Sequence, residues 1–228
     1  MSMNEPATST GEVTQSHGNP LALKALRHLF FSPSQYFRSA EIDRGPAWLF
    51  VAWISGIASV IDRVDQRMMR ADLNGGDGGM GAIVGSWRYF WALAFGAGII
   101  WACWNWWIGG WWYRIRLVWS GAADTNPRHA RLVYMFSSLV VNLPAVLYTI
   151  MESITYPNYQ AAWKADSSLS LLIIACLLWS TMVSWRAVLT SFPVRPTRAL
   201  WWFLILPITV YSIVFGVTGV LFAVADGK

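Results

Sequence analysis

The sequence predicts an all-α protein: a polytopic membrane helix bundle with about five transmembrane helices. Hydrophobic residues make up 55% of the chain and charged residues only 13%, whereas a soluble domain carries about 25% charged residues. About five long apolar stretches are each able to cross a bilayer as a helix. The chain also contains 16 Trp, a residue type that favours the membrane–water interface. These three features argue against a soluble globular domain.

Two segments precede the first apolar stretch. Residues 1–20 are rich in Ser, Thr, Gly and Glu and predict a disordered cytoplasmic tail. Residues 21–45 predict an amphipathic interfacial segment, because Leu, Ala and Phe recur at helical spacing opposite basic side chains. Ser32-Pro33 is expected to end its helix. The segment lies either on the cytoplasmic leaflet or against the bundle.

The predicted membrane domain covers residues 46–225. Its spans are expected at residues 46–61, 87–108, 132–151, 169–189 and 200–224. Polar loops are expected at 62–86, 109–131 and 152–167, where charged residues, Gly or Pro gather. The third span is expected to be interrupted at 142–144, because Pro144 cannot donate a backbone hydrogen bond.

The distribution of basic residues predicts the orientation. With the N-terminus in the cytoplasm, 11 of the 17 Lys and Arg flank the cytoplasmic ends of the spans. Lys and Arg accumulate on the cytoplasmic side of membrane proteins. We therefore expect a multi-pass protein of the cytoplasmic (inner) membrane of a bacterium, with the N-terminus inside and the C-terminus outside.

The order of these elements and several short motifs resemble the Yip family of Ypt-interacting membrane proteins. The matching residues are Ser32, Pro33, Tyr36 and Phe37 before the first span, then Gly109-Gly110, Arg114-Ile115-Arg116, Ser120-Gly121-Ala122 and Pro127, and finally the mid-membrane Pro144. Bacterial members carry the same five-span membrane domain. Eukaryotic members are implicated in vesicle trafficking, in binding prenylated small GTPases and in shaping membranes. The resemblance implies a non-enzymatic role in membrane organisation or partner recruitment.

Polar residues within the apolar spans are the first candidates for a functional site, since each needs a hydrogen-bond partner in hydrocarbon. A candidate polar pocket between the second, third and fourth spans consists of Asn105, Asn142, Pro144, Ser180 and Ser184. Such a pocket suits a lipid headgroup or a small solute. The alternative is that these groups form interhelical hydrogen bonds that only hold the bundle together.

Four arginines on the predicted cytoplasmic side are candidate contacts for anionic lipid. They are Arg114, Arg116, Arg128 and Arg131. Their contribution to membrane orientation is an alternative explanation for the same residues.

The sequence offers little for catalysis or metal binding. Glu152 sits at the outer end of the third predicted span, and no other acid lies within a span, a pattern that argues against an ion-coupled pump. Cys103 and Cys176 lie in apolar runs, and the three His form no cluster with Cys at ligand spacing. We predict no cofactor, no metal site, no catalytic residues and no enzymatic activity.

The predicted function is therefore that of a non-enzymatic integral membrane protein of Yip-like type. The alternative is a small-molecule or lipid transporter, or a channel-like protein, with a polar intramembrane pocket. A membrane enzyme acting on lipids ranks last, because acid, base and metal-binding residues are lacking. Expected partners are membrane lipids, together with a membrane or cytoplasmic protein or a second copy of the chain. Nucleic acid is not expected, because the basic residues form no stripe.

Overall fold

The computed structural model describes residues 19–39, 42–43, 45–74, 79–122, 124–165 and 170–226. These residues are helical apart from short connections, with no strand among them. The all-α class is confirmed. Residues 1–18 of the predicted tail lie outside the described residues.

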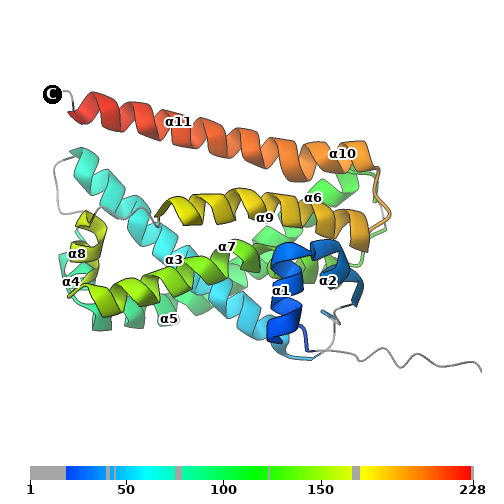
Figure 1. Ribbon diagram of the computed structural model, residues 1–228, viewed down its shortest axis with the longest axis horizontal. Helices are drawn as coiled ribbons and strands as arrows, with labels where there is room; N and C mark the ends of the chain where they lie inside the picture. The colour runs from blue at the N-terminus through cyan, green and yellow to red at the C-terminus, as the bar shows by residue number, and fades with distance from the viewer. Residues whose placement is uncertain are drawn as a thin grey trace, which may run out of the picture.

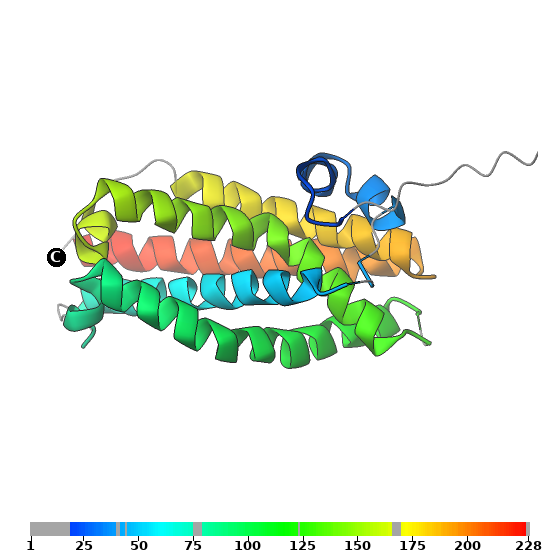
Figure 2. The ribbon, with the colours of Figure 1, turned by 90° about the horizontal axis from the view of Figure 1, so that it is seen from below.

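The long helical segments all extend from one end of the molecule toward the other, with α3 crossing the others obliquely (Figure 1); α3 and α5 form one layer and α7 and α9 the other (Figure 2). They are α3 (Ala47–Asn74); α5 (Trp87–Trp104), which continues through the π-helical segment η1 (Asn105–Gly109) into α6 (Gly110–Trp119); α7 (Pro127–Thr155); α9 (Ser170–Ser191); and α10 (Pro196–Leu200), which continues through the π-helical η2 (Trp201–Ile205) into α11 (Leu206–Asp226). The short helices are α1 (Leu23–Phe31), α2 (Pro33–Ser39), α4 (Gly81–Val84) and α8 (Tyr159–Lys164).

Four helices are long and apolar enough to cross a membrane, as an integral membrane protein requires. They are Ala47–Leu73, Pro127–Thr155, Leu171–Ser191 and Pro196–Val220. The predicted second span forms α5 and η1 and is not among these four helices.

The predicted loop at 62–86 is wrong for residues 62–74, which continue helix α3 beyond the first charged pair. Val64, Met68 and Ala71 are buried, and their spacing places them on one face of a helix. Charged residues occupy the remaining faces of the same turns. The helix therefore continues as an amphipathic helix after its apolar part ends.

The predicted loop at 109–131 is also wrong at its start, because Gly109-Gly110 lies inside a continuous helix. A Cβ atom at Gly109 would lie 2.6 Å from the Tyr134 hydroxyl, and one at Gly110 would overlap the Cγ of Arg131. The glycine pair therefore allows α7 to approach closely, which is a packing role and not a break.

Helix α7 is longer than the predicted third span and is not interrupted at 142–144. It begins at Pro127, where the Asn126 side chain accepts a hydrogen bond from the Arg128 amide at 2.9 Å. An Asn cap followed by Pro at the first helical position is a strong start signal. Pro144 lies within the helix.

Helices α1 and α2 pack against the bundle, which agrees with one of the two alternatives for residues 21–45. The Trp179 indole of α9 donates to the carbonyl of Phe30 at 2.8 Å, and Leu29, Tyr36 and Phe37 are buried. Burial raises the pKa of the Tyr36 hydroxyl well above its ordinary value, so this group stays protonated and donates to the Pro20 carbonyl. The predicted helix end at Ser32-Pro33 is confirmed.

Helices α3 and α5 touch through their backbones at Gly56 and Gly98. A Cβ atom at Gly56 would overlap the carbonyl oxygen of Gly98 and lie 2.8 Å from the amide nitrogen of Ala102. The rings of Trp48 and Trp106 lie 4.6 Å apart along the same seam. No side chain larger than hydrogen fits at this crossing.

Helix α11 stands away from the other helices along most of its length (Figure 1). Its apolar side chains are largely exposed, as at Ile213 (60%) and Val220 (63%). In water this exposed area would cost about 25 cal/mol per Å². Hydrocarbon contact removes that cost, so the helix is suited to a lipid environment.

Replacing Gly56 by Ala is expected to lower the free energy of unfolding by about 2 kcal/mol, as overpacking does. The matched control is Gly216→Ala on α11, where a Cβ atom meets nothing within 4 Å. The control is expected to be neutral or slightly stabilising, because Ala favours helix over Gly. Thermal unfolding in detergent measures both, and equal effects of the two changes would contradict the close crossing.

Candidate functional site

The structure provides Asn105 with hydrogen-bond partners on α3. Its side-chain nitrogen donates to the hydroxyl oxygens of Ser55 and Ser59, at 3.0 and 2.9 Å. Both amide hydrogens are thus bound across the seam between α3 and η1. This arrangement matches the interhelical alternative, in which the polar group holds two helices together.

The other members of the predicted polar pocket have separate partners. Asn142 donates to Ser138 of its own helix at 3.3 Å, and Ser180 donates to the carbonyl of Leu177. The Ser184 hydroxyl reaches Tyr113 of α6 at 3.5 Å, and Pro144 is partly buried in α7. None of the five predicted residues lines the cavity described below.

The four predicted lipid-contact arginines differ in exposure. Arg114 and Arg128 are exposed. Arg116 points into the bundle, where its guanidinium lies 4.7 Å from the ring of Phe203. Arg131 lies 4.3 Å from the ring of Trp107. Arg116 and Arg131 therefore help to hold helices together through cation–π contacts.

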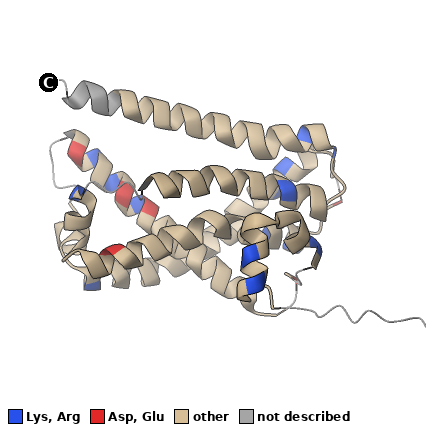
Figure 3. Cartoon of the chain, in the orientation of Figure 1, with Lys and Arg blue, Asp and Glu red and all other residues tan. Residues whose placement is uncertain are grey.

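A cavity of about 590 Å³ lies at the end of the bundle that carries α8. We call it the acidic cavity. Figure 3 shows that Asp and Glu are concentrated at this end, on the C-terminal half of α3 and on α7. Its lining comprises Ile61, Asp62, Asp65, Gln66 and Met69 of α3; Ala145, Tyr148, Thr149 and Glu152 of α7; Tyr159, Ala162, Trp163, Lys164 and Ala165 of α8 and its C-cap; and Ile173 and Ile174 of α9.

Among the residues that the structure describes, three carboxylates line the acidic cavity, and Lys164 is its one basic lining residue. Asp62 and Asp65 lie one turn apart on α3, and both they and Glu152 fall within candidate membrane spans. The prediction that no acid other than Glu152 lies within a span is therefore wrong for Asp62 and Asp65. The physical reason is that α3 extends past the first charge. Gln66 donates to the Asp62 carboxylate at 2.8 Å.

Helix α8 is held onto α3 by two hydrogen bonds. The Tyr159 hydroxyl donates to the Asp65 carboxylate, and the Trp163 indole donates to Asp72 at 2.7 Å. The Asn158 side chain caps α8 by accepting from the backbone amide of Ala161 at 2.8 Å. This short helix therefore closes one side of the cavity.

An aromatic cluster from the start of α5 supports Tyr159. Its ring stacks on Phe90 with centroids 4.4 Å apart and meets Trp87 edge-on at 5.6 Å. Burial raises the pKa of the Tyr159 hydroxyl well above its ordinary value, and the charge of Asp65 raises it further. Tyr159 therefore stays protonated and remains a donor to Asp65.

This set of groups is suited to a positively charged organic ligand. Carboxylates attract a cation, and Tyr and Trp rings add cation–π attraction. The volume lies within the range of about 300–1,000 Å³ for small-molecule sites. Among the described residues, no three His, Cys, Asp or Glu side chains come together to hold a metal ion.

Sequence reasoning missed this cavity, although part of its signal is present in α3. Asp62, Asp65, Gln66 and Met69 have the spacing of one helical face. That face is recognisable only once residues 62–74 are taken as helix. The partners on α7 and α8 are distant in sequence and give no local signal.

No protein-family model, curated protein or solved structure matches this chain. The resemblance to the Yip family therefore remains a hypothesis based on the order of the elements and on the short motifs.

Replacing Tyr159 by Phe is expected to destabilise the protein by about 1.5–3 kcal/mol, because a buried hydrogen bond to a carboxylate is lost. Tyr156→Phe removes a hydroxyl three residues earlier and is the matched control, with little expected effect. Hydrogen exchange of the α8 amides measures the change. Unaltered exchange in Tyr159→Phe would show that the bond to Asp65 does not hold α8.

Proposed function

We propose that this chain is a non-enzymatic, five-span protein of a bacterial cytoplasmic membrane that binds a small organic cation in its acidic cavity. The observation that carries the proposal is the grouping of Asp62, Asp65 and Glu152 around one cavity in which Lys164 is the only basic residue among the described lining residues. Carboxylates at membrane depth are costly and are retained mainly where they serve a function. This function corresponds to the transporter or channel-like alternative of the sequence analysis. The proposed binding site is formed by other residues than the predicted Asn105 and Asn142.

Two observations support the five-span topology. Helix α5 and η1 are flanked by Trp and pack along α3, as a Trp-rich span at the edge of a bundle would. Acidic residues gather at the α8 end, whereas the opposite end is mainly basic (Figure 3). The excess of basic charge there favours a cytoplasmic location for that end, with the C-terminus outside.

A Yip-like role in membrane organisation or partner recruitment is the second candidate. It is favoured by the structural use of the motif residues. Tyr36 and Phe37 are buried in the contact of α2 with the bundle, and Gly109-Gly110 accommodates α7. Motif residues with a packing role are expected where a chain shares its fold with a family. Such residues do not indicate which protein partner is bound, and crosslinking would identify that partner.

Calorimetric titration of the detergent-purified protein with tetraethylammonium tests the cation proposal. Asp62→Asn and Glu152→Gln are each expected to weaken binding about tenfold, because each removes one charged contact. Asp124→Asn, an exposed acid remote from the cavity, is the control and is expected to bind like the wild type. Absence of binding to the wild type, or equal weakening in the control, would reject the acidic cavity as the site.

Reporter fusions at the two ends of the chain test the number of spans. Five spans place the termini on opposite sides of the membrane, whereas four place them on the same side. We expect a fluorescent reporter at the N-terminus and an active phosphatase reporter at the C-terminus. Both reporters on one side would mean that α5 does not cross.

A further inference from the structure

A groove of about 890 Å³ lies between α2 and α9, at the end of the bundle remote from the acidic cavity (Figure 1). Its polar side is formed by Ser34, Gln35 and Arg38 of α2 together with Arg186 of α9. Trp179 and Met182 of α9 form its apolar side. We call it the arginine groove.

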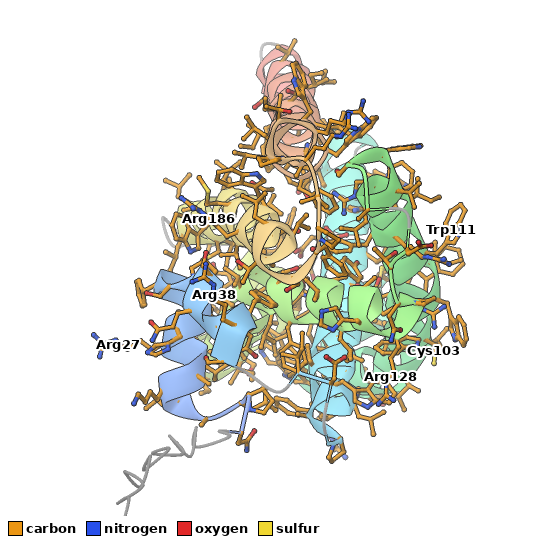
Figure 4. All side chains as sticks on the ribbon, turned by 90° about the vertical axis from the view of Figure 1, so that its right-hand side faces the viewer. Arg27, Arg38, Cys103, Trp111, Arg128 and Arg186 are labelled. Carbon is orange, nitrogen blue, oxygen red and sulfur yellow. The ribbon has the colours of Figure 1, made fainter. Side chains whose placement is uncertain are left out.

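The two arginines of the groove have no counter-ion among the described residues. Neither Arg38 nor Arg186 makes a side-chain hydrogen bond or an ion pair there, and no residue lining the groove is acidic. Both are exposed, and both lie on the same side of the bundle, opposite Trp111 and Arg128 (Figure 4). Arg186 is positioned by the ring of Trp185, 4.9 Å from its guanidinium. Two positive charges that line the same groove favour an anion within it.

An apolar stripe continues from the groove along α9. From Arg186 toward the start of α9, apolar residues recur at intervals of about one turn: Met182, Leu178, Ala175 and Leu171. The last three are exposed. From residue 186 to residue 171 the stripe is about 22 Å long, at 1.5 Å per residue. This exceeds half of the hydrocarbon core, which is about 30 Å thick.

We propose that the arginine groove binds an anionic phospholipid. The phosphate lies between Arg38 and Arg186, since guanidinium groups bind phosphate oxygens through paired hydrogen bonds. An acyl chain lies along the apolar stripe of α9. A free phosphate would use only the arginines, whereas a phospholipid fits both the charge and the stripe. The site is separate from the acidic cavity and does not depend on its ligand.

Native mass spectrometry of the full-length protein tests the proposal, after incubation with equal amounts of phosphatidylglycerol and phosphatidylcholine. The wild type is expected to retain phosphatidylglycerol preferentially. Arg38→Gln with Arg186→Gln is expected to reduce this preference about thirtyfold, from the loss of two charges near the membrane surface. Arg38→Lys with Arg186→Lys keeps the charge and is expected to retain most of the preference.

The matched control is Lys24→Gln with Arg27→Gln, which removes the same charge from exposed positions of α1 outside the groove. This variant is expected to behave like the wild type. An equal loss in the control would overturn the proposal in favour of a general charge effect. Retained preference in the double Gln variant would also overturn it, and so would displacement of the lipid by excess inorganic phosphate.

Discussion

The backbone contact between Gly56 and Gly98 fixes the relation of α3 to α5, and much of the molecule depends on it. Close approach of two helices increases dispersion contact along their whole seam. It also brings Asn105 within reach of Ser55 and Ser59, so that polar groups in an apolar layer are satisfied. Helix α3 packs against α7 as well and so joins the two layers. The carboxylates of the acidic cavity lie on the same helix, and their positions follow from this contact.

The sequence was sufficient for the class of fold and for the existence of the apolar helices, because hydropathy and Trp content are properties of composition. It was insufficient for the helix ends. Charged residues after Ile61 suggested a loop, whereas burial of Val64 and Met68 continues α3. Gly109-Gly110 suggested a break, whereas the pair accommodates α7. In both places tertiary packing overrode the local preference of the residues.

The candidate site was predictable only in part, for a related reason. A polar residue within an apolar run is visible in the sequence, and Asn105 was identified in this way. Its partners, Ser55 and Ser59, are 50 and 46 positions away and could not be identified from the sequence. The acidic cavity combines Asp65, Glu152 and Tyr159 from three helices, and Tyr159 is 94 positions from the carboxylate it binds. Only the packing of α3, α7 and α8 brings these residues together.

The π-helical turn η1 has a geometrical consequence for the long helix that contains it. A π turn includes one additional residue, and each residue of a helix turns the chain by about 100°. The faces of the helix before and after η1 are therefore rotated relative to each other about the helix axis. Helix α5 presents its inner face to α3, whereas α6 presents its inner face to α7. The continuous helix α5–η1–α6 thus packs first against α3 and then against α7. Deleting a single residue from η1 would rotate one of these packing faces toward the lipid.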